Sequence, residues 1–216
     1  MTDEPITHDE NVAKLAEYGL APRPGVDYSY DPNKRGTMPS TMTALDGNEY
    51  MIPAHHYSDN PVDAVFFYGG PFSNFVGGPW EITSAQPWAL EHTAEYETVE
   101  HYFAASKAKT AGEHEHVRGQ RGPLAAKRAG RRVELRDDWE NVKYGIMLHA
   151  LRVKFDLDYT EHRQIFRMAL IGTGDRLIAE DSPTDYIWGI RDKRGDYGGT
   201  NLLGIALMDI RAELRA

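Results

Sequence analysis

The strongest structural signal in the sequence is an amphipathic segment that runs from Asp138 to Asp156. Its apolar residues recur at intervals of three and four, so they line one side of an α-helix. These residues are Trp139, Val142, Ile146, Ala150 and Val153. The segment therefore predicts a long helix with one apolar face.

Helices are also predicted before and after this segment. One is expected over Val99–Thr110 and a second over Pro123–Gly130, where proline suits the first turn and glycine the C-terminal end. A third begins after Thr160, a good N-cap, and stops at Gly172. A C-terminal helix has an apolar face made of Leu203, Leu207, Ile210 and Leu214.

Strand signals are fewer and shorter. Val65–Tyr68 is a buried strand candidate that ends at a glycine pair, and Trp80–Thr83 is a second candidate. Residues 84–97 and 174–189 are expected to be irregular or loop-like. The predicted fold is therefore mainly α with a few short β-strands, a minor α+β component in a single multihelical domain.

The first sixty residues differ from the rest of the chain. Prolines recur at positions 5, 22, 24, 32, 39 and 53, and only Glu10–Leu20 could hold a short helix. Residues 1–60 are therefore expected to form an extended or partly disordered N-terminal extension. Residues 61–216 are expected to form the folded domain.

Composition excludes several classes of protein. The chain has 216 residues, of which 41% are apolar and 26% charged, as is usual for a globular domain. No apolar run approaches the ~20 residues that a membrane-spanning helix needs, so no membrane association is expected. Cysteine is absent, which removes disulfides, thiolate nucleophiles and cysteine-based metal sites and agrees with a cytoplasmic location. His114 and His116 diverge on a helix, so no metal site is expected there.

Charge is distributed unevenly along the chain. The net charge is −9, yet the segment 118–136 is basic. Its cationic residues are Arg118, Arg121, Lys127, Arg128, Arg131, Arg132 and Arg136. A local basic cluster in an acidic protein suits a small phosphorylated ligand better than a long duplex, whereas the alternative is a solvated helix face.

Glu100 and Lys107 form the first constellation that could carry chemistry. Residues seven apart on a helix point in nearly the same direction, so this carboxylate and this amine would share a face and flank a ligand. Tyr102 and Phe103 between them indicate that part of the helix is buried. The alternative is a surface face with opposite charges two turns apart.

Two further segments carry polar groups in backbone that is expected to be irregular. Asp185 lies near Trp188, so its carboxylate either stands beside an aromatic side chain at a site or caps the backbone of a turn. Ser73 and Asn74 follow a glycine pair. They could hold phosphate or ribose oxygens, or they belong to an ordinary turn.

Taken in order, these pieces resemble the NADAR, or YbiA-like, family over roughly residues 65 to 215. The resemblance rests on many short motifs in one order. They are Ser73-Asn74-Phe75, Glu100-His101-Tyr102-Phe103 with Lys107, Ala126-Lys127, Gly130-Arg131, Trp139-Glu140, Lys154-Phe155, Thr173-Gly174-Asp175, Ser182-Pro183 with Asp185, Trp188-Gly189 and Asn201-Leu202-Leu203-Gly204. Compact members of the family lack an extension like residues 1–60, and the stretch between Phe75 and Glu100 is long for the family.

The resemblance implies hydrolysis of an N-glycosidic bond between a phosphorylated or nucleotide-linked ribose and a base, without metal or cofactor. Some members act on phosphoribosylamino-pyrimidine intermediates of riboflavin synthesis, and others remove ADP-ribose from guanine in nucleic acid. The implied partner is a phosphorylated ribosyl or ADP-ribosyl substrate, free or in nucleic acid. The alternative is a module that binds ADP-ribose or a nucleotide without cleaving it. The sequence carries no signal for an oligomeric state.

The family's functional positions, carried over by motif, are Glu100, Trp139 and Asp185, and Lys107 matches the lysine of the same helix motif as Glu100. The residues expected to be catalytic are Glu100, Asp185 and Lys107. Glu100 would stabilise the positive charge that develops at the anomeric carbon and would activate water. Asp185 would protonate the leaving group or orient a hydroxyl, and Lys107 would hold phosphate or attack an opened ribose as an amine. The residues expected to bind substrate are Ser73, Asn74, Lys127, Arg131, Trp139 and Trp188. Trp139 would stack on the base, belong to the core, or do both.

Overall fold

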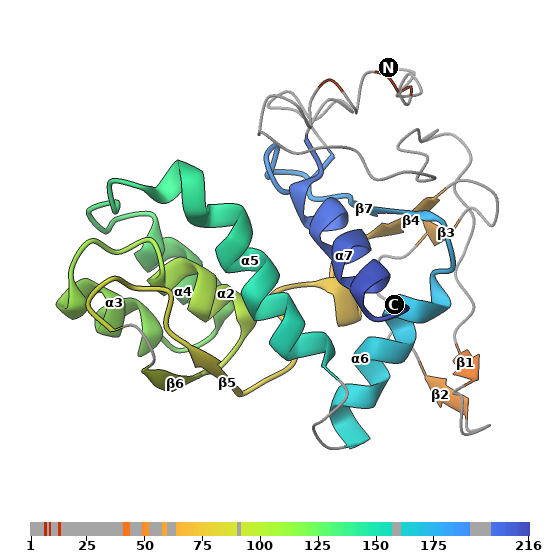
Figure 1. Ribbon diagram of the computed structural model, residues 1–216, viewed down its shortest axis with the longest axis horizontal. Helices are drawn as coiled ribbons and strands as arrows, with labels where there is room; N and C mark the ends of the chain where they lie inside the picture. The colour runs from red at the N-terminus through yellow and green to blue at the C-terminus, as the bar shows by residue number, and fades with distance from the viewer. Residues whose placement is uncertain are drawn as a thin grey trace. The chain divides into compact units, whose positions relative to one another are not determined.

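The computed structural model describes residues 7, 9, 13, 41–43, 49–51, 58–59, 64–89, 92–156, 161–190 and 200–216 (Figure 1). The chain divides into two compact units. The first unit combines Met1–Phe72 with Met168–Ala216, and the second unit is Ser73–Arg167. Most of the expected N-terminal extension, including nearly all of the short helix at Glu10–Leu20, lies outside the described residues.

Helix α2 (Val99–Ala105) is the centre of the second unit, and all seven of its residues are buried. It packs against three other helices, α3 (Ala111–Arg118), α4 (Pro123–Gly130) and α5 (Trp139–Phe155) (Figure 1). A helix that is buried around its whole circumference needs neighbours on every side. The hydroxyl of Thr98 begins α2 by accepting a hydrogen bond from the amide of His101.

Helix α4 approaches α2 at the level of the backbone. A Cβ atom at Gly130 would lie 2.9 Å from both the Cβ and the carbonyl oxygen of Ala104. No side chain fits at that distance, so glycine is required at this contact. The structure confirms the predicted bounds of α4, and the small residue that was expected to end the helix also sets how closely it packs.

Helix α5 confirms the predicted long helix, but its buried face is rotated from the expected one. Val142 and Val153 are only half-buried, whereas Met147, Leu151 and Lys154 are almost completely buried. The expected apolar stripe therefore covers only one edge of the face that is buried. The burial of Lys154 on this face could not be predicted from an apolar pattern.

A hairpin joins strand β5 (Trp80–Thr83) to strand β6 (Thr93–Tyr96) in antiparallel register within the second unit. The expectation that residues 84–97 are irregular throughout was therefore wrong at β6. Only Tyr96 of that strand is buried, so its four residues lack the alternation that indicates a strand in the sequence.

The first unit contains a small mixed sheet with the strand order β3-β4-β7. Strand β3 (Ser58–Asp59) pairs antiparallel with β4 (Ala64–Phe67), and β7 (Leu177–Glu180) pairs parallel with β4. A separate hairpin pairs β1 (Thr41–Thr43) with β2 (Glu49–Met51).

Strand β7 lies in the stretch 174–189 that was expected to be loop-like throughout, so that expectation was wrong for these four residues. Its first three residues are all buried. A strand buried on both faces gives a continuous apolar run instead of an alternating one, and a run this short carries little signal.

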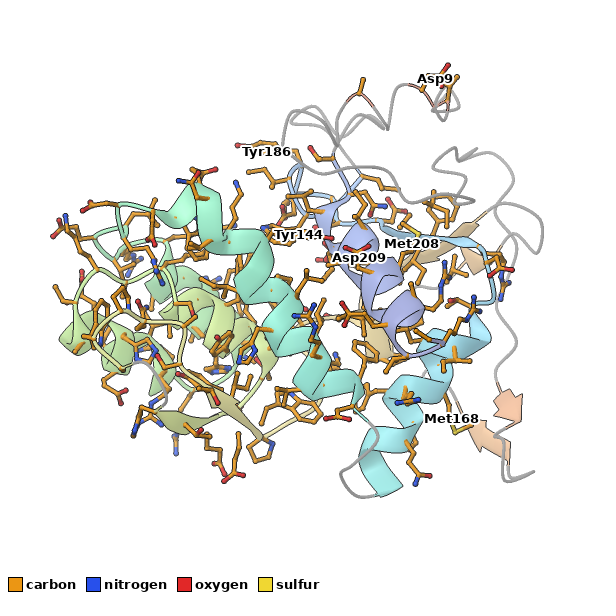
Figure 2. The ribbon with its side chains drawn as sticks, viewed as in Figure 1. Asp9, Tyr144, Met168, Tyr186, Met208 and Asp209 are labelled. Atoms are coloured by element: carbon orange, nitrogen blue, oxygen red, sulfur yellow. The ribbon has the colours of Figure 1, made fainter. Side chains whose placement is uncertain are left out.

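Helix α7 (Leu202–Glu213) packs on β7 in the first unit. A Cβ atom at Gly204 would lie 2.0 Å from the carbonyl oxygen of Ile178, so the helix backbone touches the strand backbone directly. Met208, labelled on this helix in Figure 2, is also buried. Helix α6 (Glu161–Gly172) crosses the boundary between the two units.

The predicted class, mainly α with a few short β-strands, is confirmed by this set of elements. Among the described residues, no helix is both long enough and apolar enough to cross a lipid bilayer. The boundary predicted between residues 60 and 61 lies between β3 and β4, which pair with each other, and it stays a prediction.

Candidate active site

Glu100 lies in the first turn of α2, and the residue is only 5% exposed. Its backbone amide donates a hydrogen bond of 3.0 Å to the carbonyl oxygen of Asn74. The Ser73–Asn74 segment is therefore fixed directly beside the start of the helix. The first turn of a helix favours a negative charge, because the unpaired amides there carry a partial positive charge.

Asn74 is itself buried and contacts helix α5. Its side-chain amide nitrogen lies 3.5 Å from the sulfur of Met147. Its side-chain oxygen Oδ1 is buried and has no hydrogen-bond partner within the described part of the chain. A buried acceptor is normally paired, so an unpaired one next to Glu100 indicates a position where a bound donor would be stabilised.

The turn at Ser73 is held from two directions. The amides of Phe75 and Val76 donate to the hydroxyl and the carbonyl oxygen of Ser73, at 3.2 Å in each case. The amine of Lys154 also donates to the Ser73 carbonyl, at 2.6 Å. The turn expected as an alternative for this segment is therefore present, and a buried lysine is part of it.

Lys154 is the residue of this region that the sequence analysis left without a role. Its side chain is completely buried, with the amine 4.9 Å from the centre of the Phe166 ring and 5.6 Å from that of Phe155. Burial lowers the pKa of Lys154 to about 7. It lies seven residues after Met147, so both side chains project from one face of α5 toward the Ser73–Asn74 turn. A lysine among apolar residues of a strong helix was the available signal.

Lys107 does not share a helix face with Glu100, because α2 ends at Ala105 and Ser106 is its C-cap. The expected helix over Val99–Thr110 was too long, and the argument from seven-residue spacing does not hold. The Lys107 amine instead lies 5.2 Å from the Phe103 ring centre and 5.7 Å from that of Trp139.

Phe103 and Trp139 pack against each other with ring centres 5.0 Å apart. Trp139 is only 7% exposed, so it is part of the core of the second unit. The structure thus brings one predicted catalytic residue, Lys107, and one predicted binding residue, Trp139, to the same place. An amine over two aromatic faces gains from cation–π attraction.

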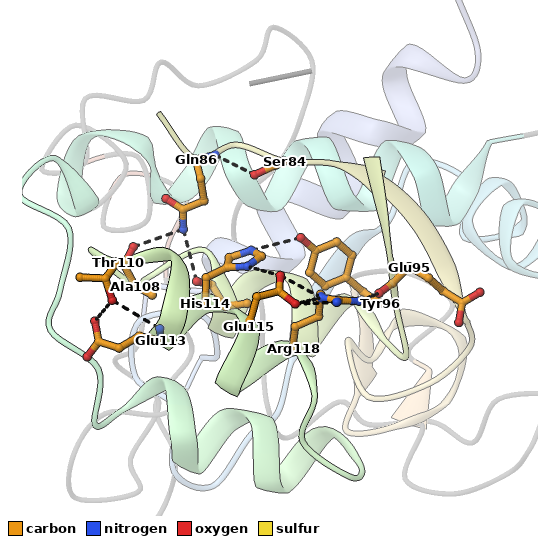
Figure 3. Close-up of polar contacts among 11 residues, drawn as sticks. Ser84, Gln86, Glu95, Tyr96, Ala108, Thr110, Glu113, His114, Glu115 and Arg118 are labelled. Atoms are coloured by element: carbon orange, nitrogen blue, oxygen red, sulfur yellow. Dashed lines mark hydrogen bonds and ion pairs between the residues drawn. The ribbon is translucent and has the colours of Figure 1, made fainter. Parts of the chain in front are cut away.

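A buried network fixes the end of α2 relative to the start of α5. The side-chain amide of Gln86 donates to the carbonyl oxygens of Ala105 and Ala108, both at 3.3 Å (Figure 3). Arg136 donates to the side-chain oxygen of Gln86 at 3.2 Å, and its own amide donates to the Lys107 carbonyl at 2.9 Å. The segment that precedes β6 was expected to be irregular, and it holds the backbone of Lys107.

Arg136 also pairs with Asp138, the residue before Trp139. The contacts are bidentate, from Nε to Oδ1 at 2.5 Å and from Nη2 to Oδ2 at 2.9 Å. The Arg136 guanidinium lowers the pKa of the Asp138 carboxyl. Because Asp138 is the N-cap of α5, this pair fixes where the helix begins and how Trp139 is presented.

The two predicted phosphate contacts lie on or just after α4. The amine of Lys127 is 5.8 Å from the centre of the Phe75 ring, so this half-buried residue neighbours the Ser73–Phe75 segment. Arg131 is exposed and follows the last residue of the helix. Lys127 is therefore placed beside other candidate residues, whereas Arg131 lies at the surface.

Asp185 and Trp188 belong to the first unit, in the segment 181–190 that follows β7. One oxygen of Asp185 accepts a hydrogen bond of 3.0 Å from the amide of Trp188. Asp185 therefore caps a turn, which is the alternative that the sequence left open. The turn is tight, since a Cβ atom at Gly189 would lie 2.5 Å from the Asp185 carbonyl oxygen. Tyr186, labelled in Figure 2, is 41% exposed.

The segment 181–190 leaves the sheet at an edge that suits a ligand. Strands β4 and β7 are parallel, so their carboxyl ends lie at the same edge, and the Asp181 amide donates to the Phe67 carbonyl there at 2.7 Å. Ligands of α/β proteins commonly bind outside the carboxyl ends of parallel strands. The position of Asp185 and Trp188 after β7 fits that pattern.

The histidine pair in α3 has structural contacts. His114 is buried and lies 3.1 Å from the hydroxyl of Tyr96 and 3.2 Å from a carboxylate oxygen of Glu115 (Figure 3). Burial lowers the pKa of His114. His116, by contrast, is exposed.

Comparison with known proteins places this arrangement in a family. The family model described as the NADAR domain matches residues 66–215. N-glycosidase YbiA of Escherichia coli (strain K12) is 34% identical over 148 residues, which cover 67% of this chain and 81% of that protein. Its NMR structure superposes with a TM-score of 0.55 and covers 71% of this chain and 85% of that one.

Two further relatives extend the comparison. N-glycosidase Npun_R5314 of Nostoc punctiforme is 35% identical over 161 residues, which cover 70% of this chain and 92% of that protein. The chloroplastic riboflavin biosynthesis protein PYRR of Zea mays is 30% identical over 157 residues, which cover 67% of this chain and 23% of that protein. The chain therefore belongs to the NADAR family, and the expectation that it is an N-glycoside hydrolase is confirmed.

Proposed function

We propose that the bond cleaved is a ribose–nitrogen bond and that Glu100 is the carboxylate beside the anomeric carbon. The observation that carries this proposal is the buried Glu100 in the first turn of α2, joined through its amide to Asn74. Breaking the bond develops positive charge on the ribose, and a fixed carboxylate in a water-poor site stabilises that charge strongly. The same carboxylate can take a proton from the attacking water.

Asn74 supplies the contact that orients the sugar. Its buried, unpaired Oδ1 accepts a hydrogen bond from a ribose hydroxyl, which places the ring next to Glu100. Ser73 belongs to the same turn, and Lys127 stands beside it as a phosphate contact. Arg131 remains a second phosphate contact, at the surface end of α4.

The remaining assignments concern the contact with the base and the roles of Lys107, Asp185 and Trp188. Trp139 and Phe103 form the aromatic pair against which a base can stack, beneath the Lys107 amine. Lys107 has two candidate roles, to hold a phosphate or to attack an opened ribose as an amine. Asp185 and Trp188 keep the roles that the family resemblance implies, as second carboxylate and aromatic contact.

The substrate belongs to the ribosyl class, and two members of that class are proposed. One is a phosphoribosylamino-pyrimidine, which the name of the maize relative supports. The other is ADP-ribosylated guanine in nucleic acid. A cytoplasmic location and a catalytic domain at residues 61–216 stay predictions of the sequence.

Mass spectrometry of the reaction products tests the proposal. The full chain and its Glu100→Gln variant are incubated separately with each substrate, and Glu81→Gln, an exposed glutamate of β5, serves as the matched control. We expect wild type and Glu81→Gln to release ribose phosphate or ADP-ribose, and Glu100→Gln to be slower by roughly 100-fold or more.

Two outcomes contradict the proposal in different ways. Full turnover by a folded Glu100→Gln variant removes Glu100 from the mechanism. Tight ADP-ribose binding by wild type without any product from either substrate favours the alternative of a binding module.

A further inference from the structure

A cleft of about 480 Å³ lies between helices α3 and α4 of the second unit, and none of the residues assigned to catalysis or substrate binding lines it. Small apolar side chains form its walls, namely Ala125, Ala129 and Val133. Polar side chains surround them, including His116 and Gln120 from the α3 side. The cleft is large enough for a ligand of several heavy atoms.

Two arginines line the α4 side of this cleft, Arg128 and Arg132. Arg128 lies on α4 and Arg132 lies two residues after the end of the helix, and both line the same cleft. Both residues are exposed, and within the described part of the chain neither guanidinium has an ion pair or a hydrogen bond. Their charge is therefore not used in any contact within the described part of the chain.

Other arginines of the basic segment 118–136 are already engaged. Arg118 pairs with the carboxylate of Glu115 and also donates to the Glu95 carbonyl at 3.2 Å (Figure 3). Arg136 is held in the network with Asp138. The basic segment therefore has a structural part and a part that is available to a ligand, and the available part includes the cleft.

The one acidic side chain that lines the cleft is occupied by the chain itself. Glu113 accepts a hydrogen bond from the Glu134 amide at 2.9 Å. It accepts another from the Thr110 hydroxyl at 3.0 Å (Figure 3). The Glu113 carboxylate joins α3 to the segment after α4 and keeps its negative charge, because both donors are neutral. With one carboxylate and two guanidinium groups, the lining of the cleft has a net positive charge.

We propose that the α3–α4 cleft is a phosphate-binding site, in which Arg128 and Arg132 hold phosphate groups of a polyanionic ligand. A guanidinium matches phosphate with two parallel hydrogen bonds, and two guanidinium groups that line one cleft can bind two phosphates of the same ligand. Among the residues that line the cleft there is no phenylalanine, tyrosine or tryptophan, so its recognition chemistry is dominated by the two guanidinium groups. The site therefore recognises phosphate and not base sequence. The ligand is either a free polyphosphate or the backbone of a nucleic acid strand.

Helix α4 connects this cleft to the candidate active site, because adjacent residues face different directions. Lys127 points to Phe75, whereas Arg128 lines the cleft. The remaining face of α4, with Ala126 and Gly130, is buried. A strand with several phosphates could therefore be held by the cleft while a ribosyl group is processed elsewhere in the unit. The phosphate site itself does not depend on the proposed hydrolysis.

The test measures binding by the full chain with two probes, tripolyphosphate by calorimetry and a fluorescein-labelled single-stranded oligonucleotide by anisotropy. The test variant is Arg128→Ala with Arg132→Ala. The control is Arg152→Ala with Arg215→Ala, which removes the same charge from two other exposed arginines. We expect the test variant to bind at least one probe about tenfold more weakly and the control to change less than about twofold.

The salt dependence provides an independent readout. For the oligonucleotide, loss of two phosphate contacts should reduce the slope of log K against log salt by about 1.4. Binding of the oligonucleotide alone identifies a strand as the ligand, and binding of tripolyphosphate alone identifies a free polyphosphate. The proposal is overturned if wild type binds neither probe, or if test and control variants weaken equally.

Hydrolysis of a small ribosyl substrate is measured in parallel. We expect the test variant to retain wild-type turnover, because neither arginine belongs to the catalytic or substrate-binding residues. A chain that binds phosphate in the cleft but hydrolyses nothing would disprove the proposed function and leave this site intact.

Discussion

The end of α2 and the segment 181–190 both carry predicted site residues, but different contacts fix them. Lys107 is positioned by groups distant in the sequence, the backbone amide of Arg136 and the side chain of Gln86. Gln86 also accepts from the Arg136 side chain, three residues before Trp139. Asp185 is positioned by its own neighbourhood, through the amide of Trp188 three residues on. The first arrangement depends on the packing of a whole unit, whereas the second depends on one turn. Substitutions should therefore have wide effects in the first region and local effects in the second.

The largest expected effect is on stability and concerns Lys154, which is fixed, like Lys107, by contacts with residues distant in the sequence. Its pKa is about 7 in the folded protein and near 10.4 when unfolded. Between these values the unfolded chain binds a proton that the folded chain does not, so the free energy of unfolding rises with pH across this window. The rise is on the order of 4 kcal/mol. We expect Lys154→Met, which keeps the length of the side chain, to lack this rise.

Urea unfolding at pH 6.5, 8 and 9.5 measures this difference. Lys109→Met is the control, because Lys109 is exposed and its carboxylate partner Asp137 raises its pKa. That control should retain the rise between pH 7 and 10. Parallel pH curves for wild type and Lys154→Met would show that the lysine is not buried as a weak base.

The next effect tests the buried network that joins α2 to α5. Arg136→Ala leaves the Gln86 side chain and the Ala85 carbonyl without their donor, and the free energy of unfolding should fall by about 3 kcal/mol. Turnover should fall as well, because the network positions Lys107 and Trp139. Thermal unfolding and steady-state kinetics measure both effects.

Arg132→Ala provides the comparison for Arg136→Ala, since it removes a neighbouring but exposed arginine. That variant should change stability by less than about 0.5 kcal/mol. If both variants lose the same stability, the network is not what fixes the end of α2.

The smallest effect separates the two roles of Asp185. Asparagine keeps an oxygen that can accept from the Trp188 amide, so Asp185→Asn should leave stability within about 0.5 kcal/mol of wild type, whereas Asp185→Ala should lose about 1 kcal/mol. If the carboxylate takes part in the reaction, both variants lose turnover, by roughly 100-fold. Wild-type turnover in a stable Asp185→Asn variant would leave Asp185 with its capping role alone.

The same comparison explains what could be predicted from the sequence. Helix α4 was predicted with its observed bounds, because Pro123 and Gly130 act locally. The end of α2 was missed, because the hydrogen bonds that replace the helix after Ala105 come from Gln86, nineteen residues earlier. Strand β7 was missed because it is short and its first three residues are all buried, which leaves no alternating pattern.

The candidate site shows the same difference between residues that local sequence reveals and residues that only distant contacts define. Glu100, Asn74 and Trp139 could be singled out by residue type and motif, and the structure adds their burial and contacts. Lys154 was noted only as part of a family motif and given no role, since a lysine in a helix is ordinarily assigned to the surface and only the folded unit encloses it. The contact between its amine and the Ser73 carbonyl spans 81 residues, a separation at which local patterns carry no information.

The contact of Gly130 with Ala104 has a consequence for how such a chain can diverge. The two positions admit almost no variation, since any side chain at Gly130 would separate α4 from α2. The exposed positions 128, on the same helix, and 132, just after it, carry no such restriction. Substitutions at these exposed positions can therefore change which anions this surface binds in the course of evolution, without altering the packing of α2, the helix that carries Glu100.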